Sequence, residues 1–259
     1  MEIRVPLAGS GTLSVRLDEP SEPADHGLIV LYLHGFGSSQ EGDKAELFRR
    51  RCLERRVGFC SFDFQGHGDS GGTMLDLSLS RNLDDLDRVR AELASRGYSR
   101  IVLFGSSMGG LTGLWYAAQH PDPITAAIHL APALGLEEVF TEDLGLASVE
   151  QWEREGKLEI GHDLGTWDIG GGFVEDLRRH DEAVLYASYR TPTLIFQGKH
   201  DDSVPWRRVV DFTTNAAGED VELHFFADGD HRLLDKLDRL WQLTEEFLGA
   251  RDILPNRKC

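Results

Sequence analysis

The chain has 259 residues and a mass of 28.9 kDa, which suits a large α/β domain with a substantial buried core. Hydrophobic residues make up 41% and charged residues 27% of the sequence, which argues against a disordered or fibrous chain. Lys and Arg total 27 against 44 Asp and Glu, a formal charge of −17. Because so acidic a surface repels phosphate backbones and anionic lipid, we expect neither nucleic acid nor membranes among its partners.

The cysteines and the start of the chain indicate where the protein resides. Cys52, Cys60 and Cys259 form no motif and are odd in number, so we expect no disulfide framework and no zinc site. The longest apolar run, residues 27–33, is too short to span a bilayer. The N-terminus shows no basic segment followed by an apolar stretch. These features predict a cytoplasmic protein.

Strands and helices are predicted to alternate along most of the chain. Two short strands around a Gly-rich turn open it as a hairpin. A continuous apolar run, typical of a strand buried on both faces, comes next and is followed by helical spacing. A mostly parallel twisted sheet with helices on both faces accounts for this alternation. The predicted strands are 2–7, 12–17, 27–33, 57–64, 101–104, 124–130, 193–197 and 222–226, and the first predicted helices are 43–56, 82–96 and 108–120.

Residues 136–190 interrupt the alternation. They contain 14 acidic and five basic residues, a net charge of −9. An insertion of about 50 residues without strand–helix rhythm is usually a lid or a disordered loop, and its six aromatic residues argue against disorder. We therefore predict a core of residues 1–135 and 191–259 with a lid inserted over 136–190. The aromatic residues that we expect to contact an apolar part of a substrate are Phe140, Trp152, Trp167 and Phe173.

The pattern Gly-x-Ser-x-Gly occurs twice, around Ser70 and around Ser107. A nucleophilic serine of this motif needs a sharp turn from strand to helix, in which glycines permit a strained backbone. Ser107 follows a predicted strand and opens a predicted helix, whose first N–H groups are free to stabilise an oxyanion. Ser70 lies in a Gly-rich stretch with no helical pattern after it. We therefore predict Ser107 as a nucleophile and Ser70 as a turn residue.

A serine hydroxyl becomes an effective nucleophile when a base takes its proton and an acid orients that base. Asp201 and His231 follow the last two predicted strands, at the carboxyl ends where open α/β sheets bind ligands. Their order after the serine, acid and then histidine, fits this chemistry. Asp202 is the alternative acid. His200, Asp201 and Asp202 together also allow a metal-binding alternative, although further ligands are missing nearby.

The loop after the first buried strand, residues 34–37, is the expected place of a second oxyanion donor. Its glycines let the backbone approach a substrate closely, so the N–H of Phe36 is expected to act with that of Met108. His34 is expected to brace this loop rather than to react, and His67 is likewise expected to be structural.

Six segments of the chain carry a family resemblance, which extends in order over nearly the whole length. They are His34-Gly35-Phe36, Gly42-x-Lys44-Ala45, Phe62-Asp63-Phe64-x-Gly66, Gly105-Ser106-Ser107-x-Gly109-Gly110, Lys199-x-Asp201-Asp202-x-Val204-Pro205-Trp206 and Asp230-His231-Arg232. Together they resemble the α/β-hydrolase family. Within it, the chain is similar to the mitochondrial palmitoyl-protein thioesterases that also cleave mycophenolic acid acyl-glucuronide, and to their prokaryotic relatives. Met108 stands where those thioesterases have leucine.

The resemblance implies an α/β-hydrolase fold and a serine hydrolase that cleaves small-molecule carboxylic esters or thioesters through an acyl-enzyme. Ser107 would attack the carbonyl carbon, His231 would act as general base, and Asp201, which matches the acid of those thioesterases, would orient it. No metal and no organic cofactor would be needed. Because the same residues also cleave amides, a serine peptidase or amidase is the alternative, and a non-catalytic binding protein on this fold is a further one. The sequence leaves the natural substrate, the acyl-chain length and the oligomeric state open.

Overall fold

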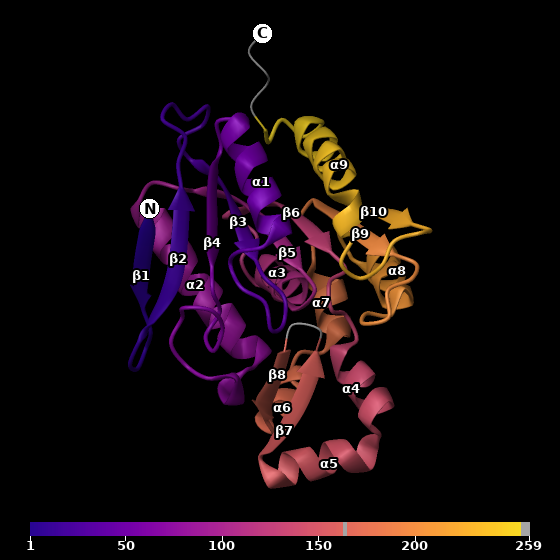
Figure 1. Cartoon of the computed structure of the whole chain (residues 1–259). Helices are drawn as coiled ribbons and strands as arrows, with labels where there is room; N and C mark the ends of the chain where they lie inside the picture. The colour runs from indigo at the N-terminus through magenta and orange to yellow at the C-terminus, as the bar shows by residue number, and fades with distance from the viewer. Residues whose placement is uncertain (163–164, 255–259) are drawn as a thin grey trace.

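The computed structural model describes residues 1–162 and 165–254, and within these ranges an eight-stranded sheet forms the centre of the molecule (Figure 1). Its strand order is β1-β2-β4-β3-β5-β6-β9-β10. From β4 to β10 the neighbouring strands are parallel, and β1 and β2 extend this sheet in antiparallel pairing. The strands are β1 (Glu2–Pro6), β2 (Thr12–Asp18), β3 (Leu28–Leu33), β4 (Gly58–Phe62), β5 (Arg100–Ser106), β6 (Ile124–Leu130), β9 (Thr193–Gly198) and β10 (Val221–Phe226).

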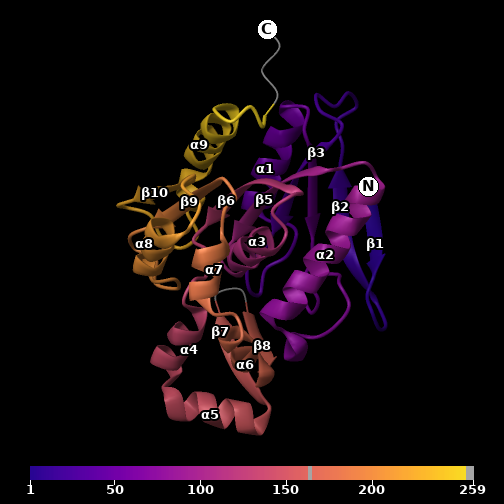
Figure 2. The same cartoon turned by 180° about the vertical axis from the view of Figure 1, so that it is seen from behind.

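Helices cover both faces of this sheet, so the α/β fold predicted from the sequence is confirmed (Figures 1 and 2). On one face α1 and α9 pack through Phe48 and Trp241, and the ring of Phe48 stacks 3.7 Å from that of Phe104 on the sheet. Apolar residues of α2, α3 and α8, and of α7 (Glu182–Ser188) from the insertion, belong to the core on the other face. The helices of the core are α1 (Asp43–Glu54), α2 (Leu79–Ser95), α3 (Met108–Gln119), α8 (Trp206–Asn215) and α9 (Leu237–Gly249), with two 3-10 turns η1 (Met74–Asp76) and η2 (Leu234–Lys236).

The predicted elements of the core match the observed ones closely, and the main difference is the start of α2. The opening hairpin is present, with Glu2 opposite Arg16. Helix α2 begins three residues before the predicted start, because the side chain of Ser78 accepts a hydrogen bond of 3.1 Å from the N–H of Arg81. A serine in this position satisfies one of the N–H groups that a helix start leaves without partners.

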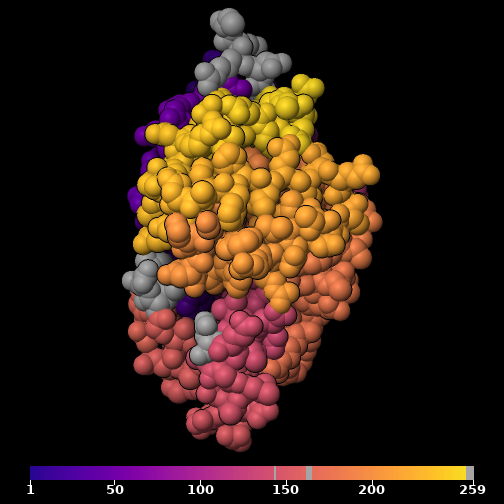
Figure 3. All heavy atoms as spheres, turned by 90° about the vertical axis from the view of Figure 1, so that its right-hand side faces the viewer, coloured from indigo at the N-terminus to yellow at the C-terminus, as the bar shows by residue number. Residues whose placement is uncertain are grey.

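The short elements of residues 136–178 gather at one end of the molecule, whereas the last helix of the insertion lies against the core helices α3 and α8 (Figure 1). In the space-filling view this insertion meets the core beside a hollow in the surface (Figure 3). Its internal packing centres on Trp152, whose indole N–H donates to the carbonyl of Ile169 at 2.9 Å and whose ring packs against Phe140 and Phe173. The insertion comprises α4 (Leu136–Leu144), α5 (Leu146–Glu155), the antiparallel pair β7 (Lys157–His162) and β8 (Gly165–Gly170), α6 (Gly172–Arg178) and α7 (Glu182–Ser188).

Asp176 on α6 connects the insertion to the core. Its carboxylate accepts hydrogen bonds from the N–H of Ser80 at 2.9 Å and from the hydroxyl of the same residue at 2.6 Å, in the first turn of α2. A carboxylate in this position also interacts favourably with the dipole of α2. In the part of the chain that the structure describes, no helix is long and apolar enough to cross a membrane.

Candidate active site

Ser107 occupies the sharp turn between β5 and α3. Its backbone has φ 54° and ψ −120°, a positive φ that serine adopts under strain. Glycine is required on both sides of it: a Cβ on Gly105 would lie 2.6 Å from the carbonyl oxygen of Gly109, and one on Gly109 would overlap the carbonyl oxygen of Leu33. The motif therefore produces the turn that the sequence predicted.

The backbone of Ser107 is held from both directions. Its N–H donates to the carbonyl of Leu130 at the end of β6, at 2.9 Å. Its carbonyl accepts from the N–H of Leu111 at 3.0 Å and from that of Ala133 at 3.1 Å. These bonds offset the strain and fix the direction in which the side chain leaves the turn.

Asp201 lies directly after β9 and contacts His231. The Oδ2 atom of Asp201 accepts from the Nδ1 of His231 at 2.9 Å and from the side-chain amide of Gln197 at 2.8 Å. Its Oδ1 accepts from the backbone N–H groups of Ser203, at 3.0 Å, and Val204, at 2.8 Å. Burial acts to raise the pKa of this carboxyl, but the hydrogen bond and charge of His231 and the other donors outweigh it and lower the pKa.

Asp202, the alternative acid, is exposed and accepts from the hydroxyl of Ser203 at 3.2 Å instead. The contact with His231 therefore distinguishes Asp201 from Asp202, which the sequence alone left as alternatives. Gln197 was missed by the sequence analysis. The available signal was a polar side chain at the end of an otherwise apolar strand, directly before the loop with the acid.

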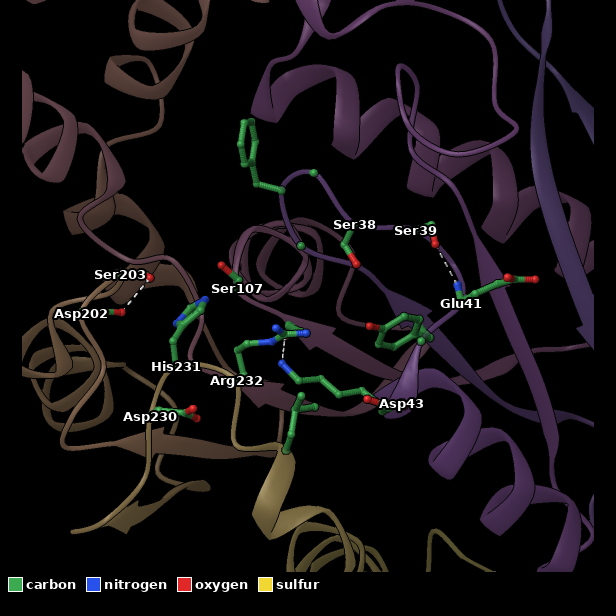
Figure 4. A pocket seen from close by; sticks show the side chains of 18 of the residues that line it. Ser38, Ser39, Glu41, Asp43, Ser107, Asp202, Ser203, Asp230, His231 and Arg232 are labelled. Carbon is green, nitrogen blue, oxygen red and sulfur yellow. Dashed lines mark hydrogen bonds between the residues drawn. The ribbon is translucent and has the colours of Figure 1, made fainter. Parts of the chain in front are cut away.

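His231 and Ser107 line one cavity of about 620 Å³, and Figure 4 shows both side chains at that cavity. The Nδ1 atom of His231 is engaged by Asp201, so its Nε2 is the ring nitrogen that can serve a hydroxyl or a ligand in the cavity. Arg232, Asp230 and Asp202 line the same cavity (Figure 4). The three residues predicted to react are therefore brought together, and their catalytic roles stay a prediction.

The loop between β3 and α1 forms another wall of the cavity and carries Phe36. His34 and His67 support it, as expected. The Nε2 of His34 accepts from the N–H of Phe64 at 3.0 Å, and the Nε2 of His67 accepts from the N–H of Gly37 at 3.2 Å. Burial, and secondarily the charge of His67, lower the pKa of His34 to about 3, so this imidazole is neutral and its Nε2 is free to accept the hydrogen bond from the N–H of Phe64.

Met108 is the first residue of α3, where backbone N–H groups have no partner inside the helix. This is the position that an oxyanion donor next to Ser107 requires. Gly35, on the facing loop, lies so close that a Cβ there would be 3.2 Å from the Cβ of Ser107. The loop and the turn are thus adjacent, and the pairing of the Phe36 and Met108 N–H groups as oxyanion donors stays a prediction.

Ser70 lies outside the cavity, in a turn that follows β4 and is hydrogen-bonded to β2. Its hydroxyl donates to the carbonyl of Asp63 and accepts from the N–H of Ser14 at 2.8 Å. Both the donor and an acceptor function of this hydroxyl are thereby used in holding two strands together. The structural interpretation of Ser70 agrees with these contacts.

The four aromatic residues proposed for the lid do not line the cavity that contains Ser107. Phe140, Trp152 and Phe173 pack against one another, within the apolar cluster that also covers one face of the sheet. Trp167 on β8 behaves differently: its ring lies 5.5 Å from that of Phe36, edge to face, and a Cβ on Gly37 would clash with it. Contact with the substrate stays a prediction for all four, and Trp167 is the one placed against the loop of the site.

His200, Asp201 and Asp202 were also considered as metal ligands. Within residues 1–162 and 165–254, no group of three or more His, Cys, Asp or Glu side chains is arranged to hold a metal ion. Asp201 turns toward His231 rather than toward its two neighbours, and His200 and Asp202 line the cavity.

Comparisons with known proteins agree with this architecture. The palmitoyl-protein thioesterase ABHD10 of mouse mitochondria is 24% identical over 212 residues, which cover 81% of this chain and 70% of that protein. A putative hydrolase from Agrobacterium vitis matches with a TM-score of 0.83 and 24% identity, over 95% of this chain and 97% of that one. Est1E from Butyrivibrio proteoclasticus, solved with ferulic acid bound, matches with a TM-score of 0.76 and 22% identity, over 95% and 99%. At these identities the likeness to the solved structures shows the shared α/β-hydrolase fold.

A family model identifies the chain more specifically. The model described as serine aminopeptidase, S33, a hydrolase family, matches residues 24–155, just over half of the chain. The matched region contains the loop with Phe36 and the turn with Ser107. This protein belongs to that family of α/β-hydrolases.

Proposed function

We propose that this protein is a serine hydrolase that cleaves carboxylic esters or thioesters of small molecules through an acyl-enzyme. The observation that carries the proposal is the hydrogen bond from His231 to the buried Asp201, in a cavity that His231 shares with Ser107 on its strained turn. An oriented imidazole next to a serine at a helix N-terminus is the arrangement that acyl transfer requires. The similarity to a palmitoyl-protein thioesterase supports the same substrate class.

In this mechanism the Nε2 of His231 takes the proton of the Ser107 hydroxyl while the oxygen attacks the carbonyl carbon of the substrate. Asp201 keeps the imidazole in the tautomer with the proton on Nδ1 and stabilises the imidazolium that forms. The N–H groups of Phe36 and Met108 stabilise the oxyanion. The proton then passes from Nε2 to the departing oxygen or sulfur, and His231 activates water to release the acid from Ser107.

A serine peptidase or amidase is the second candidate, because the family model that matches the chain is described as a serine aminopeptidase. Both candidate reactions would use the same residues, and amides have the poorer leaving group. The two candidates are therefore distinguished by the ratio of the rate of ester cleavage to the rate of amide cleavage. Butyryl p-nitroanilide and p-nitrophenyl butyrate form a matched pair for this comparison. We expect kcat/KM to be at least about a hundredfold higher for the ester than for the anilide. A higher kcat/KM for the anilide would favour the peptidase.

The experiment for the ester proposal is hydrolysis of p-nitrophenyl acetate, butyrate, octanoate and palmitate by the wild type and by Ser107→Ala. We expect the variant to lose about a thousandfold or more in kcat on every ester. Ser70→Ala is the matched control, since that hydroxyl lies outside the cavity. Equal activity of Ser107→Ala and the wild type would refute the proposal, and the best chain length among the four would size the acyl pocket.

A further inference from the structure

Lys44 lies close to the nucleophile turn and takes no part in the mechanism described above. It is the second residue of α1, and its Nζ donates to the hydroxyl of Ser106 at 2.8 Å. Ser106 is buried and directly precedes Ser107, and both line the cavity together with Lys44. A positive charge is thus held one residue from the predicted nucleophile.

The position of Lys44 is unfavourable for a lysine that only supports the fold. The first turn of a helix carries the positive end of the helix dipole, which favours carboxylates such as Asp43 and Glu46 over a cation. Among the described residues, the ammonium donates a hydrogen bond to the hydroxyl of Ser106, and no carboxylate lies within ion-pair distance of it. A half-buried ammonium that forms no direct ion pair costs stability, so a function at the site would explain its presence.

Charges from the loops after β9 and β10 surround this ammonium. Burial and the charge of Arg232 lower the pKa of Lys44 to about 8, and the carboxylates of Asp230 and Asp201 act in the opposite direction. Further titratable groups that line the same cavity are Glu41, Asp43, His200, Asp202 and His231. The protonation of Lys44 therefore changes within the pH range in which a serine hydrolase is assayed.

We propose that Lys44 is a positioning residue for the reaction at Ser107: its ammonium orients the hydroxyl of Ser106 at the turn and adds positive charge beside the place where the substrate oxygen becomes negative. The inference rests on the proposed function, because it assigns a role in acylation of Ser107. A positive charge near a developing oxyanion lowers the energy of the transition state more than that of the bound ester. The neutral amine retains the hydrogen bond but not the charge.

The expected signature is a fall of kcat/KM in the wild type as the pH rises through about 8, the pKa of Lys44. Lys44→Met should lower kcat on p-nitrophenyl butyrate about tenfold at pH 7.5, with KM changed less than twofold, and should show no fall near pH 8. Lys44→Arg keeps a charge that does not titrate, so it should restore most of the activity and also lack the fall. Ser106→Ala removes the hydrogen bond and keeps the charge, which separates the two contributions.

The test measures two quantities from pH 6 to pH 10: kcat/KM on p-nitrophenyl butyrate, and the rate at which a fluorophosphonate labels Ser107, followed by protein mass. Lys157→Met is the matched control, because Lys157 is an exposed lysine on the insertion that pairs with Asp168 at 2.6 Å. Should Lys44→Met fail to fold, the wild type and Lys44→Arg profiles carry the test. A wild type without the fall near pH 8, or a Lys44→Met or Lys44→Arg variant that retains that fall, would overturn the role of Lys44.

The outcome for Lys44 is distinguishable from that for the proposed function. If Ser107→Ala is inactive and unlabelled while Lys44→Met behaves as the wild type, the hydrolase proposal stands and the inference about Lys44 fails. If Ser107→Ala hydrolyses the ester as the wild type does, the hydrolase proposal itself fails.

Discussion

The core and the insertion of this protein are built on different principles. In the core, apolar strands such as β3, which is buried along its whole length, form a parallel sheet whose carboxyl ends bring Ser107, Asp201 and His231 together although they are far apart in sequence. In residues 136–190, short helices and a hairpin pack around Trp152 and present an acidic surface. The core therefore holds the candidate active site, while Trp167 of the insertion contacts the loop of that site at Phe36.

Among the substitutions that test this difference between the core and the insertion, the largest effect on kcat is expected at Asp201, the predicted acid of the site. Asp201→Asn should lower kcat on p-nitrophenyl butyrate by about 10⁴-fold, because an amide can hold His231 in the wrong tautomer. Asp202→Asn, whose carboxylate faces solvent, should stay within about threefold of the wild type, with unfolding temperatures of both variants measured as a control for folding. Equal losses in the two variants would contradict the assignment of Asp201.

A second prediction separates two tryptophans of the insertion. Trp152→Ala should lower the free energy of unfolding of the protein by about 3–5 kcal/mol, because it removes a buried ring and an indole hydrogen bond. Trp167→Ala, which is half-buried against Phe36, should cost less stability and should change the preference between acetate and octanoate esters instead. Urea unfolding followed by circular dichroism, together with the ester series, measures both. The reverse pattern would assign the substrate contact to Trp152.

The smallest effect is expected at Ser70, in the core but outside the cavity. Ser70→Ala should lower the free energy of unfolding by about 1–3 kcal/mol, because the N–H of Ser14 loses its acceptor. The kcat of this variant on p-nitrophenyl butyrate should remain within threefold of the wild type. A loss of several hundredfold without unfolding would make Ser70 part of the catalytic machinery.

The sequence predicted the core better than the insertion for physical reasons. Buried parallel strands and amphipathic helices leave long hydrophobic patterns, and a strained turn leaves glycines, so Ser107 was found from Gly105 and Gly109. The pair β7 and β8 is short and partly exposed, which leaves no clear alternation in the sequence. The contact of Lys44 with Ser106 joins residues far apart in the chain, and that of Gln197 with Asp201 depends on how the loop after β9 turns back, so neither pairing could be predicted from the sequence.

The central claim is that Ser107 is the nucleophile, and covalent labelling tests it most directly. The protein would be treated with a fluorophosphonate at pH 7.5, digested, and the modified peptide identified by mass spectrometry. We expect one adduct, on Ser107, that is absent from Ser107→Ala and strongly reduced in His231→Asn. An adduct on Ser70, or labelling of Ser107→Ala at the rate of the wild type, would contradict it.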